Sequence, residues 1–267
     1  MAAVYVDSPN NPLLKEFKRL QKSSRYRYTT QQIALEGPNL VREALKAGLT
    51  PRVVFYTGDY FERGGKEWLS SLDPSVKQLK LTLPLFNKIS DTETPQAVAA
   101  ILPFDPGKSI KIPETSFELV LILDRIRDPG NMGTIIRTAA AAGVEALYYT
   151  TGSADPYSPK VLRATAGTIF SLPIGMSRDP INLLSKLTEN NIQVIAACSD
   201  ADQNYWSVDY SKPVALIVGN EASGISDRLL AETDLQVSIP LARNTESLNA
   251  SVASAVILFE IIRQRRT

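Results

Sequence analysis

The feature that most constrains the fold is an alternation of short apolar runs with helical segments in the second half of the chain. Segments with helical periodicity separate most of these runs. Strands that are apolar on both faces and alternate with helices are typical of a parallel sheet covered on both sides. We therefore expect an α/β fold. The runs are LVLILD (119–124), ALYYTT (146–151), IQVIAAC (192–198), VALIVG (214–219) and LQVSIP (235–240).

Helices are expected from about Met132, around 158–167, over 181–190 and from about Ser247. In the last of these, apolar residues recur at three- and four-residue intervals and are predicted to form one stripe that faces the core. The stripe consists of Leu248, Val252, Val256, Phe259 and Ile262.

The chain is long enough for two domains, with 267 residues of which 44% are hydrophobic. A strand end, an amphipathic helix closed by Gly48 and a strand at 52–57 indicate a small α/β domain in the first part of the chain. A segment containing prolines and a glycine follows it and is typical of a linker. We expect an N-terminal domain over 1–104, a linker over 105–116 and a second domain over 117–267.

Composition excludes several classes of site. The chain has no histidine, so histidine-based catalytic triads and histidine-ligated metals are excluded, and no metal site is expected. The single cysteine, Cys198, is predicted to lie buried in a strand. The apolar runs are too short for a membrane span and Met1 begins no signal-peptide pattern, so a cytoplasmic location is expected.

Basic residues are concentrated near the N-terminus, although the formal net charge of the chain is only +1. Glu16 is the one acidic residue among them, and Tyr26 and Tyr28 are interleaved with the arginines. Such a pattern suits RNA phosphates and exposed bases, and a solvated helix surface is the alternative. The candidate RNA-binding residues are Lys15, Arg19, Arg25 and Arg27, with Lys18 and Lys22 beside them.

Three loops with unusual polar residues each follow a predicted strand. They are DRIRDPGNMG (124–133), GNEASG (219–224) and IPLARNTESLN (239–249). Because ligands bind beyond the carboxyl ends of strands in open parallel sheets, we expect the three loops to form one pocket.

In the second loop, Gly219 and Gly224 allow close backbone approach, while Asn220 and Glu221 supply an amide and a carboxylate. The same residues also make ordinary turns. In the third loop, Ser247 is a candidate helix cap. Asn249 is expected inside the first turn of the last helix, where its amide needs a hydrogen-bond partner.

The first loop offers Asn131 at its tip and leads into a small-residue helix that carries Arg137. A single arginine on so apolar a helix needs a partner. That partner is either a ligand or, in the alternative interpretation, a structural ion pair with Asp124 or Asp128.

The three loops, in this order, resemble the signature motifs of the SpoU/TrmH family of RNA ribose 2′-O-methyltransferases, within the SPOUT superfamily. The matching segments are 124–143, 216–226 and 239–260. The N-terminal segments LEGPNLVREALKAG (35–48) and ISDTETPQAVAAIL (89–102) are similar to the RNA substrate-binding domain of the members that modify ribosomal RNA. The resemblance covers nearly the whole chain.

The resemblance implies a parallel α/β catalytic domain with a deep trefoil knot, S-adenosylmethionine as cofactor, and a homodimer whose active site forms at the subunit interface. It places Arg137 as the catalytic group, supported by Asn131, Glu221, Ser247 and Asn249. The implied cofactor-binding residues are Gly219, Asn220, Gly224, Ile239, Pro240 and Leu248.

Ribosomal RNA is the favoured substrate, and transfer RNA or a noncatalytic role in ribosome assembly is the alternative. A Rossmann-type enzyme would have G-x-G-x-x-G after the first strand, where this chain has DPGNMG. The third motif departs from the family pattern at two positions, with Ala242 where proline is frequent and Arg243 where glycine is frequent.

Overall fold

The structure is a computed structural model that describes residues 4–105, 117–242 and 247–266. The chain divides into two compact units, which are described separately. Unit 1 comprises Met1–Gly107 and Tyr157–Phe170, and unit 2 comprises Lys108–Pro156 and Ser171–Thr267.

Unit 2 is built on a six-stranded parallel sheet with the strand order β11-β9-β10-β6-β7-β8. The expected α/β fold with a parallel sheet is therefore confirmed. The strands are β6 (Leu119–Asp124), β7 (Ala146–Thr150), β8 (Ile174–Ser177), β9 (Gln193–Ala197), β10 (Val214–Gly219) and β11 (Leu235–Val237). The helices are α7 (Pro129–Ala141), α9 (Pro180–Glu189), α10 (Asp227–Leu230) and α11 (Ala250–Arg265), with a 3-10 turn, η3, at Tyr205–Ser207.

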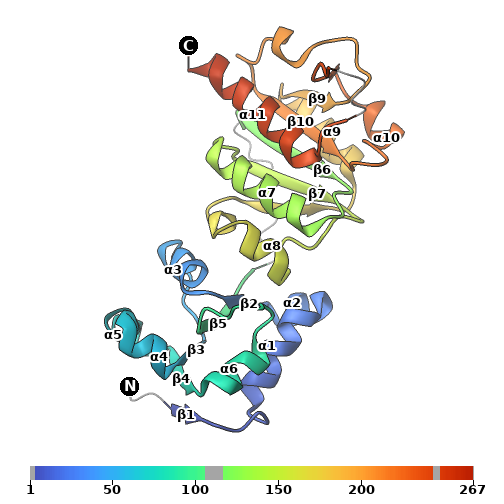
Figure 1. The fold of residues 1–267 in the computed structure, drawn as a ribbon. Helices are drawn as coiled ribbons and strands as arrows, with labels where there is room; N and C mark the ends of the chain where they lie inside the picture. The colour runs from blue at the N-terminus through green and yellow to red at the C-terminus, as the bar shows by residue number, and fades with distance from the viewer. Residues whose placement is uncertain (1–3, 106–116, 243–246, 267) are drawn as a thin grey trace. The chain divides into compact units, whose positions relative to one another are not determined.

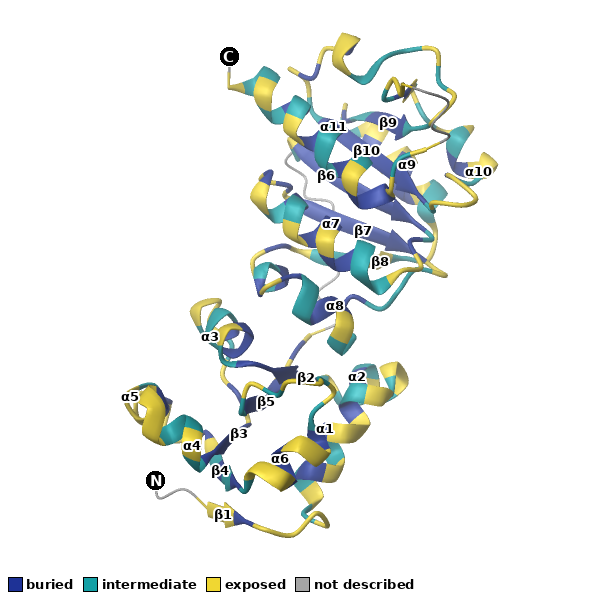
Figure 2. Ribbon diagram, viewed as in Figure 1, coloured by how far each residue is buried: buried dark blue, intermediate teal, exposed yellow. Residues whose placement is uncertain are grey.

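Helices cover both faces of this sheet. Leucines of α9 pack with one set of alternate strand residues, among them Ile122 and Ile217. Helices α7 and α11 lie side by side on the sheet (Figure 1). Strands β6 and β10 of this sheet are buried along their length (Figure 2).

The strand register brings the carboxyl ends together. Gly219 at the end of β10 pairs with Asp124 at the end of β6. On the other side of β10, Val218 pairs with Ala197 of β9, which in turn pairs with Val237 of β11. The loops after β6, β9, β10 and β11 therefore begin from one edge of the sheet.

Both helices that carry site residues begin elsewhere than expected. α7 begins at Pro129, three residues before Met132, because the Asp128 carboxylate caps it by accepting from the Asn131 N–H at 2.8 Å. α11 begins at Ala250 rather than near Ser247, because Asn249 is its N-cap. Asn249 therefore precedes the first turn instead of lying within it, and Ser247 is not the cap.

The predicted core stripe of the last helix is wrong. Val252 and Phe259 are 47% and 51% exposed, and the other three residues of the stripe are only half-buried. The last helix is apolar on all sides, so its periodicity did not distinguish the face that packs on the sheet. The residues of α11 that are buried are Ala250, Ser251, Ser254, Ile257, Leu258 and Ile261.

Unit 1 contains a five-stranded mixed sheet with the order β1-β4-β3-β5-β2, in which β5 is antiparallel to its two neighbours. Its strands are β1 (Val4–Val6), β2 (Gln32–Glu36), β3 (Val53–Thr57), β4 (Lys77–Leu81) and β5 (Val98–Pro103). Its helices are α1 (Pro12–Lys22), α2 (Ser24–Thr30), α3 (Pro38–Lys46), α4 (Gly58–Tyr60), η1 (Phe61–Gly65), α5 (Lys66–Ser70), α6 (Leu83–Ile89), α8 (Pro159–Ala164) and η2 (Thr168–Phe170).

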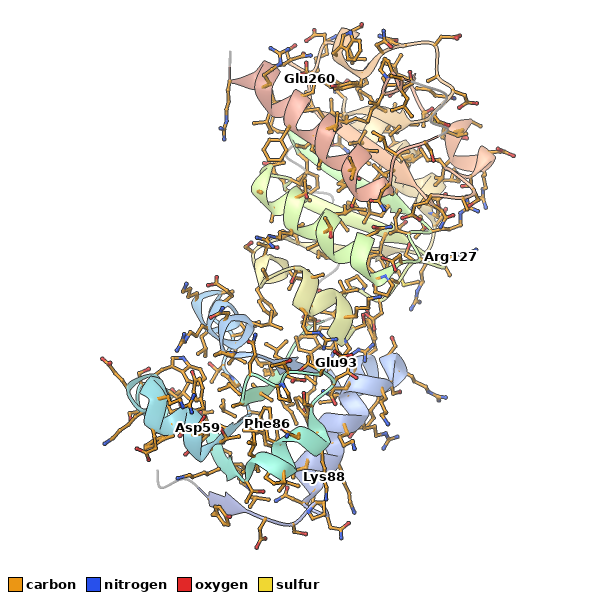
Figure 3. All side chains as sticks on the ribbon, in the orientation of Figure 1. Asp59, Phe86, Lys88, Glu93, Arg127 and Glu260 are labelled. Atoms are coloured by element: carbon orange, nitrogen blue, oxygen red, sulfur yellow. The ribbon has the colours of Figure 1, made fainter. Side chains whose placement is uncertain are left out.

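The core of unit 1 lies between the sheet and helices α1 and α6. Phe17 of α1 meets Phe55 of β3 edge to face, with ring centroids 5.4 Å apart, and Phe86 of α6 is fully buried in the same cluster (Figure 3). Buried aromatic pairs of this kind stabilise a small core beyond the area that they bury.

The two units differ from the expected domains in one segment. Tyr157–Phe170 belongs with unit 1, although the sequence placed it in the second domain. The reason is packing: the ring of Tyr157 lies 4.7 Å from that of Phe104, and α8 contacts β2. All but Asp105 of the expected linker lies outside the described residues.

Candidate active site at the carboxyl ends of the parallel strands

A pocket of about 330 Å³ opens where β9, β10 and β11 end and α11 begins. Its volume is in the range of small-molecule sites, and its walls combine aliphatic side chains with backbone. Seven of the residues singled out from the sequence line it: Gly219, Asn220, Glu221, Gly224, Ile239, Ser247 and Leu248. Pro240, the remaining cofactor-binding candidate, lies between two lining residues but is not one itself.

The second loop is folded tightly against itself. A Cβ on Gly219 would lie 2.4 Å from the backbone of Gly224 and Ile225, so only glycine allows this return of the chain. Gly224 has a φ of +60°, and its backbone exchanges two hydrogen bonds with that of Asn220. The Asn220 Oδ1 accepts from the Ala222 N–H at 3.0 Å and from the Ser223 N–H at 3.1 Å, which fixes the loop in one shape.

Asp124, the last residue of β6, joins the loops around it. Its side chain is 4% exposed. One oxygen accepts from the Ser226 N–H at 2.9 Å and from Arg125 Nε at 3.1 Å, and the other accepts from Thr150 Oγ1 at 2.9 Å. Because a buried carboxylate is costly unless its acceptor sites are used, these bonds hold the ends of β6, β7 and the loop after β10 in a fixed relation.

Side chains from all three motif loops form one polar chain. Asn131 donates its amide N–H to the Glu221 carboxylate, and Asn249 Nδ2 donates to Asn131 Oδ1 at 2.9 Å. The Asn249 Oδ1 accepts from the Ser251 N–H at 2.9 Å as the cap of α11. The three loops therefore meet through these side chains, but the prediction that all three form one pocket is wrong: no residue of the first loop is among those that line it, and Asn131 and Asn249 lie outside its lining.

Arg137 lies outside the pocket. Its side chain is exposed on α7, and within residues 4–105, 117–242 and 247–266 it makes no hydrogen bond or ion pair. The proposed structural ion pair is wrong for both partners, because Asp124 pairs with Arg125 and Asp128 caps α7. Arg137 is therefore a cation available to a ligand or to another molecule.

The loop after β9 contributes three lining residues that were missed: Cys198, Ser199 and Asp200. Cys198 was expected inside a buried strand. It instead follows the last residue of β9, Ala197, and is half-buried in the pocket wall. Burial, together with the negative charge of Asp200, raises the pKa of the Cys198 thiol. The rule that ligands lie beyond strand ends applied to this loop as well and would have found it.

The basic residues of α1 and α2 comprise five that are exposed and one, Arg27, that is buried. Lys15, Lys18, Arg19, Lys22 and Arg25 are exposed on α1 and α2. Their one acidic neighbour, Glu16, pairs with Arg52. The guanidinium of Arg19 lies 4.0 Å from the centre of the Tyr26 ring, a cation–π contact.

Arg27 is a correction to the predicted RNA-binding set. Its side chain is 3% exposed, and its Nη1 donates to the carbonyl oxygens of Leu20 at 2.6 Å and Gln21 at 3.2 Å. These carbonyls lie in the last turn of α1, where backbone acceptors need partners. Arg27 therefore joins α2 to α1 and does not present its charge at the surface.

The described ranges contain neither a candidate metal site nor a candidate membrane span. No group of three or more cysteine, aspartate or glutamate residues there could hold a metal ion, and no helix there is long and apolar enough to cross a membrane. The two departures from the third motif differ in what is described: Ala242 is exposed, and Arg243 lies outside the described residues.

Family models match both units. The model of the SpoU rRNA Methylase family matches residues 118–259, and that of the MRM3-like substrate binding domain matches residues 11–100. The chain is similar to an uncharacterized tRNA/rRNA methyltransferase of Synechocystis, with 35% identity over 97% of this chain and 94% of the relative. It is 32% identical to the 23S rRNA (guanosine(2553)-2′-O)-methyltransferase RlmP of Bacillus subtilis, over 96% of this chain and 98% of the relative.

Solved structures give the same relation. The SpoU methyltransferase AviRb from Streptomyces viridochromogenes, in complex with AdoMet, superposes with a TM-score of 0.88 at 27% identity, covering 97% of this chain and 99% of that one. An AdoMet-bound rRNA methyltransferase from Sinorhizobium meliloti superposes with a TM-score of 0.84 at 31% identity, covering 98% of each chain. With both family models and full-length relatives in agreement, the chain belongs to the SpoU rRNA methylase family.

Proposed function

We propose that this protein transfers a methyl group from S-adenosylmethionine to a ribose 2′-hydroxyl of ribosomal RNA. The observation that carries the proposal is the polar chain of Glu221, Asn131 and Asn249 beside a pocket of about 330 Å³. Relatives that act on 23S rRNA, and the matched substrate-binding model, support ribosomal RNA. Transfer RNA stays the alternative substrate.

The pocket residues fit the proposed cofactor. Aliphatic side chains, including Ile239 and Leu248, line the walls, and the backbone of the tightly folded Gly219–Gly224 loop is accessible. A flat purine ring suits such walls, and polar groups at the rim suit an amino-acid tail. When bound, S-adenosylmethionine supplies an electrophilic methyl group. Gly219, Asn220, Gly224, Ile239 and Leu248 would hold it, with Pro240 at the edge.

The polar chain fixes the orientation of its amides. Because Glu221 accepts from the Asn131 amide N–H, the Asn131 oxygen must face Asn249, which donates to it. Two Asn249 hydrogen-bond partners, Ser251 and Asn131, restrain its rotamer. A preorganised set of this kind can hold a ribose in line for transfer without reorganising, and Ser247 adds a hydroxyl at the pocket wall.

Arg137 has a separate role in this proposal. A guanidinium stays protonated in proteins, so it is a poor base. Arg137 instead stabilises the negative charge that develops on the ribose oxygen and positions the adjoining phosphate, while the proton passes to an RNA phosphate or to water. If lysine at position 137 supported most of the activity, the requirement for a planar bidentate cation would be refuted.

A homodimer would bring Arg137 to a pocket. Val252 and Phe259 on α11 are about half exposed, and α11 lies beside α7, which carries Arg137. Exposed apolar residues on one helix face are typical of a subunit contact. We propose that two copies pack through this face and that the Arg137 of one copy serves the pocket of the other.

Sedimentation of the Phe259→Glu variant tests the dimer. A charge at the centre of the contact should yield monomers, whereas Lys186→Glu, an exposed change on α9, should leave the dimer intact. Co-expression of Arg137→Ala with Asn249→Ala then tests whether each site is built from two chains. In a mixed dimer, one site would combine the intact Asn249 of one copy with the intact Arg137 of the other and should be active. Activity that stays absent in the mixed dimer would refute a site built from two chains.

RNA binding is assigned to the exposed basic face of α1 and α2, which comprises Lys15, Lys18, Arg19, Lys22 and Arg25. Lysine and arginine neutralise phosphates with a salt dependence that reports their number. A trefoil knot and a cytoplasmic location complete the proposal. The knot is implied by the family resemblance, and the location is supported by the similarity to a Bacillus subtilis enzyme that acts on 23S rRNA.

Methyl transfer from labelled S-adenosylmethionine to total RNA from cells that lack this gene tests the function. The wild-type protein should label one ribosomal RNA, and Arg137→Ala should not. Tight binding of RNA without any labelling would favour the noncatalytic assembly factor instead.

A further inference from the structure

The pocket contains one charged side chain that the polar chain does not use. Among the described residues that line the pocket, only Asp200 and Glu221 carry charge, and both are acidic. The Glu221 carboxylate is occupied by the Asn131 amide. Asp200 is exposed and has no hydrogen-bond or salt-bridge partner in the part of the chain that the structure describes.

The position of Asp200 separates it from the polar chain. It follows β9, while Glu221 follows β10 and Asn131 follows β6. In the sheet order β11-β9-β10-β6, the two carboxylates therefore flank the pocket from different strands. No lysine or arginine is among the described lining residues. A cation does contact the loop that carries Glu221, where the Arg125 Nη2 donates to the Gly224 carbonyl oxygen at 3.4 Å, so Asp200 is the lining charge without such a partner.

We propose that Asp200 is a specificity residue that makes the pocket favour positively charged S-adenosylmethionine over the neutral product, S-adenosylhomocysteine. The inference rests on the proposed function, since it takes this pair as the ligands of the pocket. The sulfonium gives S-adenosylmethionine one more positive charge than the product, and apart from this charge the two ligands differ only by the methyl group. An unpaired carboxylate therefore acts on their difference: it stabilises bound S-adenosylmethionine and leaves the affinity for the product nearly unchanged.

The charge of Asp200 already acts on another wall residue. It adds to burial in raising the pKa of the Cys198 thiol. Because Cys198 is the single cysteine of the chain, alkylation of the whole protein reports on this one site. The pocket therefore offers a readout that does not depend on methyl transfer.

Asp200→Asn in the full-length protein tests the proposal, with Asp202→Asn as the matched control. Asp202 is exposed two residues further along and does not line the pocket. The dissociation constants of S-adenosylmethionine and S-adenosylhomocysteine are measured by calorimetry for all three proteins. Removal of one unit charge from the wall of a partly aqueous site predicts that Asp200→Asn lowers the preference for S-adenosylmethionine about fivefold, with the product affinity nearly unchanged.

Equal weakening of both ligands would overturn the proposal, since it would mean that Asp200 contacts a group common to both, such as the ribose hydroxyls. An unchanged preference would overturn it as well. Cys198 alkylation at pH 8 should become faster in Asp200→Asn, because removal of the negative charge lowers the thiol pKa. If wild-type protein binds neither ligand and neither protects Cys198, the proposed function itself fails, an outcome distinct from unchanged discrimination in a protein that binds both.

Discussion

Replacement of Asp124 by alanine should destabilise unit 2 far more than the loss of a surface charge. Asp124 is buried and accepts three hydrogen bonds, from Ser226, Thr150 and Arg125. A hydrogen bond to a charged group contributes about 1.5–3 kcal/mol net. The Arg125 side chain is 30% exposed, so its pair with Asp124 is discounted to under about 0.5 kcal/mol.

The two remaining bonds, to Ser226 and Thr150, give a loss of about 4 kcal/mol in the free energy of unfolding. For a unit of this size a urea m-value of about 2 kcal/mol/M converts that loss into a midpoint lower by about 2 M. Thr150→Val removes the hydroxyl that donates to one carboxylate oxygen of Asp124 and accepts from the Arg125 backbone N–H. It should lower the urea midpoint by about half as much.

The two tryptophans of the chain allow each unit to be followed separately. Trp68 lies in unit 1 and Trp206 in unit 2. In a Trp68→Phe background, the fluorescence of Trp206 should report the shifted transition. In a Trp206→Phe background, Trp68 should report a transition that Asp124→Ala leaves in place.

Asp202→Ala, an exposed aspartate of the same unit, serves as the control and should change stability by less than about 0.5 kcal/mol. If Asp124→Ala moved the Trp206 transition no further than this control does, the buried carboxylate would not be holding the strand ends together, and the reasoning would be refuted.

Arg27 and Arg25, two neighbouring arginines of α2, should affect different properties, namely stability and RNA binding. Arg27→Ala should lower the stability of unit 1 by about 3 kcal/mol, because it removes the partner of two backbone carbonyls. Arg25→Ala should instead leave urea unfolding unchanged and weaken RNA binding, with a flatter salt dependence. Urea unfolding and filter binding across a salt series distinguish the two variants, and equal effects of both variants on both properties would contradict the assignment. Glu260 on α11 (Figure 3) accepts from Arg263 and Gln264, which lowers the pKa of its carboxyl to about 2. Since a lowered pKa stabilises the fold above the unfolded pKa, this stabilisation should be lost as the pH falls from about 4.5 to about 2. It should not exceed about 0.5 kcal/mol because Arg263 is exposed, and acid titration of Glu260→Gln should show no such loss if the pair is the cause.

The sequence predicted five of the six strands of unit 2, because each of these five has a recognisable apolar run. It missed β8, the edge strand at Ile174–Ser177, because its four residues, none of them buried, form no such run. β6 and β10 have the expected bounds of 119–124 and 214–219. The meeting of Asn131, Glu221 and Asn249 followed from one rule, that loops after parallel strands gather at one edge. Residues 90 or more apart in the chain are in contact for that reason.

Other features depended on which side chains of a helix point toward the core. Sequence periodicity does not show this when every side of a helix is apolar or when a run of residues is basic throughout. The predicted stripe on α11 included Val252 and Phe259, and both are exposed. Arg27 belonged to a basic run, yet it is the member that turns inward to cap α1. The start of α7 was predictable, since Asp128 and Pro129 are a typical N-cap and first helical residue.

The most direct test of the central claim is a comparison of ribosomal RNA nucleosides from cells that lack this gene with those from cells complemented by the wild-type protein or by Arg137→Ala. Digestion and mass spectrometry distinguish a methyl group on ribose from one on a base. We predict that one 2′-O-methylnucleoside is absent without the gene, returns with the wild-type protein and does not return with Arg137→Ala. A methyl group found on a base, or a nucleoside profile that is the same in all three strains, would contradict the account.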